Sequence, residues 1–251
     1  MRQCAPIVLV HGLLGFDRVK VGPFQVGRYF PGIEEALKAD GFRVAVPSLS
    51  KTRGVVTRAH ELKAFLRENF PNEKVHLLAH SMAGLDSRYM LSRLGMENRV
   101  LSLTSIATPH RGSSFADWGI RHLVRLVRPV ANLFGISIQA FRDLTTEGCR
   151  RLMENCHDVP WVNYHSVAGV CDTANVTPRW RLSARIVSAA EGLNDGVVSV
   201  ESARHGTSFE LWNGDHMNLV NRPNNRTPDW RGKPGDYLQL ARRVAELDRS
   251  R

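Results

Sequence analysis

The sequence contains no apolar run long enough to cross a membrane. A spanning helix needs about 20 consecutive apolar residues, whereas the first apolar run, Ile7 to Val10, ends at His11 and Gly12. The same run is too brief for the apolar core of a secretory signal peptide. We therefore expect no stable membrane span and, as the chain stands, a cytoplasmic protein, although a secreted chain trimmed of its leader would look the same.

Cysteine is scarce, with four residues in 251: Cys4, Cys149, Cys156 and Cys171. They show no close metal-type spacing, and four cysteines in so long a chain do not form a disulfide framework. We expect buried thiols, although one bridge among the last three residues stays open. The sequence thus predicts neither a metal site nor a cofactor.

Acidic residues are outnumbered, since 24 Asp and Glu against 34 Lys and Arg give a net charge of +10. Such an excess suits nucleic acid, anionic lipid or simply a solvated basic surface. The basic residues are scattered, however, and no zinc-finger or RNA-binding motif accompanies them. We expect no nucleic-acid partner, and the charge says nothing of the oligomeric state.

The chain is nevertheless apolar enough to fold around one large core, with 43% apolar and 23% charged residues in 251. No internal repeat, low-complexity stretch or linker divides it. We therefore expect a single domain over residues 1–251.

Short apolar runs alternate with segments of helical period. Strands are expected at "PIVLV", "FRVAVP", "KVHLLA", "VLSLTSIA", "VNYHSVAG", "ARIVSAA" and "SFELWNG". Helices are expected at "GIEEALKAD", at "VVTRAHELKAFLRENF", directly after Ser81 and from Tyr237 to about Leu247. The helix after Ser81 has Ala83, Ser87, Met90, Leu91 and Leu94 on one face. This alternation predicts an α/β fold with a mostly parallel central sheet and helices on both faces.

Ligands bind such a sheet at the carboxyl ends of its strands. Four polar residues directly follow predicted strands or lie in the loops beyond them: His11, Ser81, Asp195 and His216. The chemistry of the protein should be sought there.

Ser81 lies in "LLAHSMAGLD", between a predicted strand and a predicted helix. A nucleophile elbow holds its serine in a strained turn and needs small residues two positions before and after it. Ala79 and Ala83 occupy these positions, and each adds only one methyl group to the usual glycine. The alternative is that Ser81 only caps the helix, because serine is favoured there.

A serine nucleophile needs a histidine base, which in this fold comes late in the chain. Only His205 and His216 follow the late strands. We favour His216 because its loop follows "SFELWNG" directly, whereas His205 lies in a polar stretch typical of solvated residues.

The acid that orients the base is expected between the serine and the histidine. Asp195, in an Asn-Asp-Gly turn, has that place in the chain order, although such turns are often merely exposed. Asp215 adjoins His216 and could scarcely fold back to hold its ring. Asp172 and Glu191 remain as substitutes.

Amide donors for an oxyanion are expected from Met82, directly after the serine, and from Leu13 in the loop after the first strand. Gly12 gives that loop freedom to direct its amides.

Five motifs together carry a resemblance along nearly the whole chain: "PIVLVHGLLGFD", "AHSMAGLDSRYM", "IATPHRGSSFADW", "GLNDGVV" and "DHMNLVN". In this order they resemble the bacterial triacylglycerol lipases of the α/β-hydrolase superfamily. The resemblance implies a serine carboxylic ester hydrolase with Ser81 as nucleophile, Asp195 as acid and His216 as base, and with oxyanion amides from Leu13 and Met82.

Two positions depart from the family pattern. Ala83 stands where most relatives have glycine, which concerns how tight the elbow is. Asn218 stands where secreted relatives have an aspartate that binds calcium. Because a neutral amide is a poorer ligand for calcium than a carboxylate, we expect no structural calcium.

Residues 115–155 form a segment too long for a simple crossover. Its stretch "IRHLVRLVRPVANLFGI" separates basic from apolar positions, with Arg121, Arg125 and Arg128 on one side and Leu123, Leu126 and Val127 on the other. The periodicity fits a mobile lid or a permanently docked helix equally well. The family resemblance implies a lid. Trp118, Phe134 and Phe141 are candidates to line an acyl pocket, although aromatics at such spacing are more often core.

The sequence therefore predicts a lipase acting on acylglycerols or other fatty-acyl esters at a lipid interface. A short-chain carboxylesterase, a phospholipase or an acyltransferase would use the same triad. A non-catalytic binding protein of the hydrolase fold is the alternative from another class.

Overall fold

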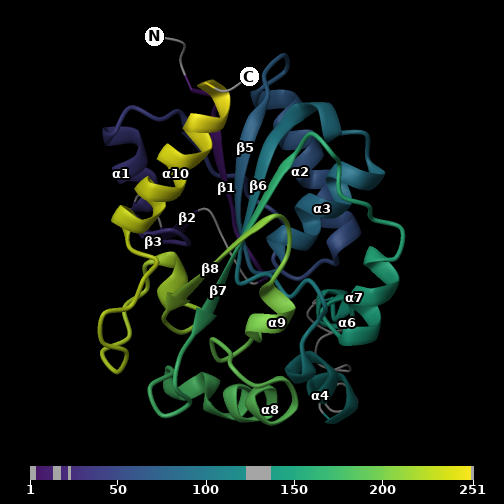
Figure 1. The fold of residues 1–251 in the computed structure, drawn as a ribbon, viewed down its shortest axis with the longest axis vertical. Coiled ribbons are helices and arrows are strands. Elements are labelled where there is room, and N and C mark those ends of the chain that lie inside the picture. Colours follow the sequence, from purple (N-terminus) through teal and green to yellow (C-terminus); the bar gives the residue numbers. More distant parts are fainter. Residues whose placement is uncertain (1–3, 14–17, 22–23, 123–136, 250–251) are drawn as a thin grey trace.

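The computed structural model describes residues 4–13, 18–21, 24–122 and 137–249 (Figure 1). The strands are β1 Ile7–Val10, β2 Arg18–Val21, β3 Phe24–Arg28, β4 Val44–Ala45, β5 Val75–His80, β6 Val100–Ile106, β7 Asn163–Val170 and β8 Ser208–Asn213. The helices are α1 Ile33–Ala39, α2 Val55–Asn69, α3 Ala83–Arg93, α4 Ser114–His122, α6 Gln139–Asp143, α7 Thr146–Met153, α8 Arg181–Glu191, α9 Val200–Ala203 and α10 Pro234–Arg249.

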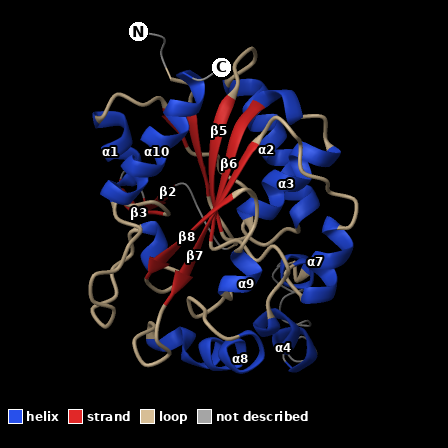
Figure 2. Ribbon diagram, in the orientation of Figure 1, coloured by secondary structure: helices blue, strands red, loops and turns tan. Residues whose placement is uncertain are grey.

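Six strands form one sheet in the order β4-β1-β5-β6-β7-β8 (Figure 2). Every neighbouring pair in it is parallel, and β1 runs beside β5 from Ile7 opposite His76 to Val10 opposite Ala79. The residues of β1 and β5 are all buried, as in parallel strands covered on both faces. The expected α/β-hydrolase type of sheet is confirmed.

Helices cover both faces of this sheet (Figure 1). One apolar cluster packs α2 and α3 against the sheet and includes Leu62, Met90 and Leu77. A second cluster packs α1 and α10 against the other face and includes Leu37 and Tyr237. Because both faces are covered, the carboxyl-end loops of the strands are left to form the site.

The segment "ARIVSAA" was expected as a strand and is instead part of helix α8. Its buried residues Ser183, Ala184 and Val187 have helical spacing, while Leu182 is exposed. Gly192, at φ 85°, ends the helix. An apolar run this short does not distinguish a strand from a half-buried helix. In the structure it forms a helix that packs beside α4.

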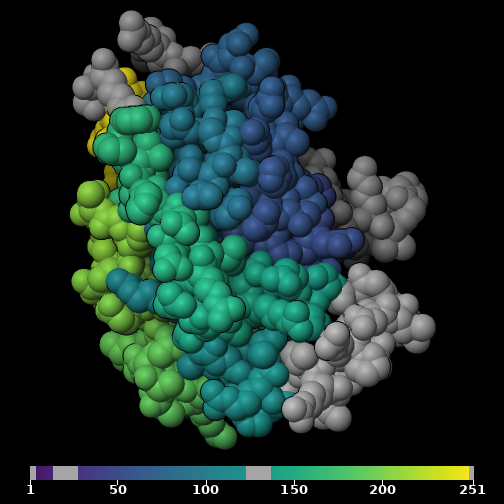
Figure 3. Space-filling view, turned by 90° about the vertical axis from the view of Figure 1, so that its right-hand side faces the viewer, coloured from purple at the N-terminus to yellow at the C-terminus, as the bar shows by residue number. Residues whose placement is uncertain are grey.

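The segment between β6 and β7 contributes α4, α6 and α7, which lie beside one another (Figures 1 and 3). Most of the amphipathic stretch, including Arg125, Arg128 and Phe134, falls outside the described residues. Of this stretch, Ile120, Arg121 and His122 at the end of α4 belong to the described part.

Candidate active site

Ser81 occupies a sharp turn between β5 and α3. Its φ of 58° is left-handed and therefore strained for a residue with a side chain. The turn is held by two hydrogen bonds: the Ser81 amide donates to the Ile106 carbonyl at 2.8 Å, and the Thr108 hydroxyl donates to the Ser81 carbonyl at 2.7 Å. This strand–turn–helix geometry is that of a nucleophile elbow, and a simple helix cap does not require it.

Small residues make the close approach of strand and helix possible. Ala79 and Ala83 are fully buried in the core, so their methyl groups fit without opening the turn. The tightest position is the next one, Gly84, where an added Cβ would lie 2.7 Å from Cγ2 of Thr108. Gly12 is confined as well, since its Cβ would lie 2.8 Å from Cβ of Ser81.

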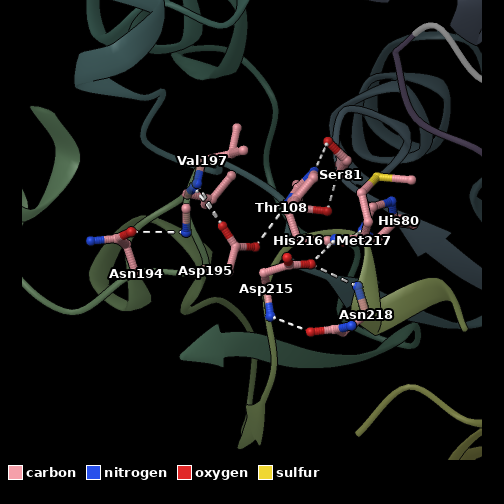
Figure 4. A network of polar contacts seen from close by, with 12 residues as sticks. His80, Ser81, Thr108, Asn194, Asp195, Val197, Asp215, His216, Met217 and Asn218 are labelled. Atoms are coloured by element: carbon pink, nitrogen blue, oxygen red, sulfur yellow. Dashed lines mark hydrogen bonds and ion pairs between the residues drawn. The ribbon is translucent and has the colours of Figure 1, made fainter. Parts of the chain in front are cut away.

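The structure brings Ser81, His216 and Asp195 together (Figure 4). Nε2 of His216 lies 3.0 Å from Oγ of Ser81, although the residues are 135 positions apart. Nδ1 of His216 lies 2.7 Å from Oδ2 of Asp195. Because the carboxylate accepts from Nδ1–H, Nε2 keeps a lone pair that faces the serine hydroxyl.

Asp195 is fully buried and its orientation is fixed by main-chain groups. Its Oδ1 accepts hydrogen bonds from the amides of Val197 and Val198 at 2.9 and 2.8 Å. Its carbonyl accepts the amide of His216 at 2.8 Å. The other carboxylate oxygen is thereby left to the imidazole.

The alternative acids and the alternative base serve other contacts. Glu191 accepts from the Ser114 amide and the Ser199 hydroxyl. Asp172 accepts from the Ala174 amide. His205 lies 3.1 Å from Oδ1 of Asp158. The structure does not place any of the three against Ser81 or His216.

Tyr29 and His80, which sequence reasoning missed, connect the same elements. The Gly12 amide bonds to the Tyr29 hydroxyl, and that hydroxyl lies 2.8 Å from Nδ1 of His80. Nε2 of His80 lies 3.1 Å from the carbonyl oxygen of His216. His80 must donate to that carbonyl, so Tyr29 donates to Nδ1. Three loops of the site are thus joined by one hydrogen-bonded chain.

Burial keeps the two histidines beside Ser81 and Gly12 neutral. It is the largest cause lowering the pKa of His80 well below its ordinary value, and the neighbouring His216 lowers it further. Burial also lowers the pKa of His11 to about 4. The neutral ring of His11 bonds to the Gly12 carbonyl through Nδ1 and accepts the Leu49 amide at Nε2.

Arg58 holds the loop after β1 in place through buried hydrogen bonds. Its guanidinium is fully buried and donates to the His11 carbonyl at 2.5 Å and to Asp86 at 2.7 Å. Burial raises the pKa of Asp86 to about 7, against the effect of Arg58. The loop that carries Leu13 is therefore anchored to the first turn of α3.

The amides of Leu13 and Met82 are the expected oxyanion donors. Met82 follows Ser81 in the elbow, and Leu13 borders the same cavity as Ser81. Neither amide makes a hydrogen bond to another described residue. Both therefore keep their donor capacity for a ligand, as an oxyanion hole requires.

The side chains of Asn218 and Asp215, where relatives were expected to bind calcium, accept hydrogen bonds from neighbouring residues. The side-chain oxygen of Asn218 accepts the Asp215 amide at 2.9 Å. Oδ1 of Asp215 accepts the amides of Met217 and Asn218, and Oδ2 accepts from Thr177 and Asn224. Protein donors thus already bond to both side chains, and a neutral amide remains a poorer calcium ligand than a carboxylate. The absence of a structural calcium stays a prediction.

An apolar cavity of about 630 Å³ opens beside Ser81 and His216. Its other lining residues are Leu13, Tyr29, Pro109, Ser113, Phe115, Ala116, Phe141, Leu144, Arg179, Trp180, Val197, Val198, Met217 and Arg222. Phe141 lies there as expected, and Phe134 is outside the described residues. Trp118 is not among the described lining residues: it stacks on Phe115 and His122, and Phe115 lines the cavity in its place.

Comparison with known proteins agrees with this geometry. Residues 5–123 match the family model of the alpha/beta hydrolase fold. The chain is 30% identical to triacylglycerol lipase 2 of Saccharomyces cerevisiae over 276 aligned positions, which cover 90% of this chain and 82% of the yeast protein. It is 39% identical over 127 positions to a triacylglycerol lipase of Vibrio cholerae, covering 49% of this chain and 37% of that protein. The chain thus spans about a third of this bacterial relative.

Solved structures share the fold at lower identity. The Staphylococcus hyicus lipase superposes with a TM-score of 0.77 at 18% identity, covering 99% of this chain and 97% of that one. The metagenomic carboxyl esterase MGS0156 superposes with a TM-score of 0.78 at 19% identity, covering 98% and 77%.

The fold and the site define a hydrolase of the α/β-hydrolase superfamily. Within it, the chain belongs to the triacylglycerol lipase family and is an enzyme of the lipase and esterase class. Among its described helices, none is both long and apolar enough to pass through a bilayer.

Proposed function

We propose that the protein hydrolyses acylglycerols or related fatty-acyl esters, with Ser81 as nucleophile, His216 as base and Asp195 as the acid that orients the base. The hydrogen-bonded chain from Ser81 through His216 to Asp195 carries this proposal. A non-catalytic protein of this fold would have no need to maintain the strained turn at Ser81.

The reaction follows from these contacts. Oγ of Ser81 attacks the ester carbonyl carbon while Nε2 of His216 takes the hydroxyl proton. The carbonyl oxygen becomes an anion that accepts from the amides of Leu13 and Met82. When the carbon–oxygen bond to the alcohol breaks, His216 returns its proton to the leaving alcohol. Water then attacks the acyl enzyme, with His216 again as base, and releases the acid and the Ser81 hydroxyl.

The cavity supports an acyl chain as the group bound next to Ser81. Its described lining is largely hydrocarbon and aromatic, including Phe115, Phe141 and Leu144. Such walls exclude water and contribute about 25 cal/mol for each Å² of apolar surface that they bury. Because Phe115 belongs to α4 and Phe141 to α6, the segment between β6 and β7 borders the cavity. We propose that this segment covers it as a lid.

A phospholipid is the second candidate substrate, because Arg179 and Arg222 line the same largely apolar cavity. A guanidinium matches the geometry of a phosphate group, whereas a triacylglycerol has no negative charge. Arg179 is exposed, over the ring of Trp180, so it can meet a headgroup at the cavity mouth.

The proposal is tested by replacing the nucleophile. Ser81→Ala should lower kcat for a chromogenic acyl ester by about 10⁴-fold or more. Ser188→Ala, at an exposed position of α8, should leave it unchanged. Turnover by Ser81→Ala at the rate of the Ser188 control would contradict the mechanism.

The substrate class is tested with esters of increasing chain length, below and above their solubility limits. A lipase should act fastest on emulsified long-chain esters, and a lid predicts a jump in rate at the solubility limit. A preference for short soluble esters would instead indicate a carboxylesterase. Faster release from phosphatidylglycerol vesicles than from triacylglycerol emulsions would favour the phospholipid.

A further inference from the structure

Three side chains that the reaction does not use meet at the opposite end of the sheet. Cys4 lies just before β1, His76 is the second residue of β5, and Asp248 lies in the last turn of α10. One ligand atom from each lies within 4.8 Å of the other two. The strands begin at this end (Figure 1), so the cluster is remote from Ser81 at their carboxyl ends.

The main chain already holds two of the three groups in place. Oδ2 of Asp248 accepts the Ala5 amide at 2.9 Å, which leaves Oδ1 directed at Nε2 of His76, 3.1 Å away. The His76 amide donates to the Pro6 carbonyl at 2.8 Å.

The imidazole of His76 is oriented as in a metal site. It is fully buried, and its Nδ1 lies 2.7 Å from the hydroxyl of Ser102 on β6. A hydroxyl can accept as well as donate, so Ser102 can accept Nδ1–H and leave the lone pair of Nε2 for an ion. A second hydrogen bond of this kind is usual for histidines that bind metals, because it fixes the ring and its tautomer.

We propose that Cys4 Sγ, His76 Nε2 and Asp248 Oδ1 bind one zinc ion, with water as the fourth ligand. A thiolate, an imidazole and a carboxylate together suit zinc and its soft or borderline analogues better than calcium or magnesium. Zinc bonds of about 2.0–2.3 Å hold tetrahedral ligands roughly 3.3–3.8 Å apart. The three ligand atoms already lie within 4.8 Å of one another, so small side-chain shifts bring them to these separations. Binding releases the thiol proton to solvent.

The ion would join the segment before β1 to the end of α10. Cys4 and Asp248 are both partly exposed, which gives the ion a path from solvent and leaves room for the water. Because the ion binds the folded chain and not the unfolded chain, it shifts the folding equilibrium toward the folded state. The effect should fall on stability and not on ester hydrolysis, because none of these ligands reaches the candidate active site.

The test is to titrate the intact, chelator-stripped protein with Co²⁺, whose bond to a thiolate produces a charge-transfer band in the near ultraviolet. The wild type should show a band that saturates at one equivalent and disappears when Zn²⁺ is added. Cys4→Ser should abolish the band, and Ser102→Ala should weaken binding about 10-fold through the lost partner of His76. Cys156→Ser, which removes a thiol elsewhere, should retain it.

A thermal melt gives the second readout. Excess Zn²⁺ should raise the Tm of the wild type by about 3–6 °C and leave Cys4→Ser unchanged, while the ester hydrolysis rates of all these variants stay equal. The proposal is overturned if the wild type gives no saturable band, or if the band survives Cys4→Ser.

Discussion

His80 donates a hydrogen bond to the carbonyl oxygen of His216 across 3.1 Å, and the two rings lie 4.6 Å apart. His80 directly precedes Ser81, so the backbone that presents the proposed nucleophile also holds the proposed base. Tyr29 completes this support by joining His80 to Gly12 in the loop of the oxyanion donors. The relative positions of the three loops are therefore set by hydrogen bonds as well as by packing.

Tyr29→Phe should reduce kcat with little change in KM. The variant keeps the aromatic ring in the cavity wall but removes the hydroxyl that donates to Nδ1 of His80. The imidazole of His80 can then flip and lose its hydrogen bond to the His216 carbonyl. The loss of one buried hydrogen bond, about 1–1.5 kcal/mol, corresponds to roughly a 10-fold lower kcat. Tyr164→Phe is the matched control, because that hydroxyl accepts the Val159 amide within the core. Equal kcat values for the two variants would refute the supporting role of Tyr29.

Gly12→Ala should lower kcat far more than an alanine at a glycine with open space around it. The new methyl group would press on Ser81 and displace the loop that carries Leu13. Overpacking of this kind costs about 1–3 kcal/mol, and a lost oxyanion donor lowers kcat by about 10²–10³-fold. Gly235→Ala in α10, with no atom within 4 Å of the new Cβ, should retain full activity. Full activity of Gly12→Ala in the same assay would contradict the assigned loop.

The free energy of unfolding should fall as the pH drops from about 6.5 toward 4. Buried His11, His80 and His110 have pKa values lowered by burial in the folded state, to about 4 for His11. The unfolded chain binds protons on these residues from about pH 6.5 downward while the folded chain does not, so acid favours unfolding by roughly 1.4 kcal/mol per pH unit for each residue.

Two buried carboxyls oppose this trend. Burial raises the pKa of Asp86 to about 7 and also raises that of Asp143. The folded chain therefore binds their protons first, which stabilises it as the pH falls. Since at least three histidines act in the other direction, the net slope should still be a loss. Urea unfolding at pH 7.5, 6 and 5 checks this, and a free energy that is flat or rises toward pH 5 would show the histidine contribution to be wrong.

Calcium should not stabilise the wild type, because Asn218 and Asp215 bond to protein donors. Asn218→Asp should lower stability by about 2 kcal/mol, since it removes the donor to the Arg222 carbonyl and adds a charge beside Asp215. Added calcium should then recover part of the loss in this variant alone. A Tm of the metal-free wild type that rises with calcium would contradict this interpretation.

The sequence predicted the parts of the site that follow from strand order. Ser81 and His216 come after β5 and β8, and parallel strands bring their carboxyl ends to one edge of the sheet. Asp195 was expected after a strand that is in fact α8. It still reaches His216, because its loop folds back over the end of β7, where a Cβ on Gly169 would lie 2.7 Å from Cβ of Asp195.

Other features depended on contacts that no local pattern shows. Tyr29 lies 51 positions from His80, and nothing in the residues around either one marks the pairing. Cys4 and Asp248 are likewise separated by nearly the whole chain, so their spacing resembled no metal motif. Phe115 and Trp118 are both aromatic and lie one turn apart in α4, so the sequence could not show that Phe115 is the one that lines the cavity.

The most direct test of the account is labelling with a fluorophosphonate, which reacts only with an activated serine hydroxyl. The wild type should take up one equivalent, and peptide mapping should locate it on Ser81. Asp195→Asn should react far more slowly, because the wrong tautomer of His216 then faces the hydroxyl. A wild-type protein that takes up no label, or that carries the label on another serine, would contradict the claim that Ser81, His216 and Asp195 act as one proton-transfer unit.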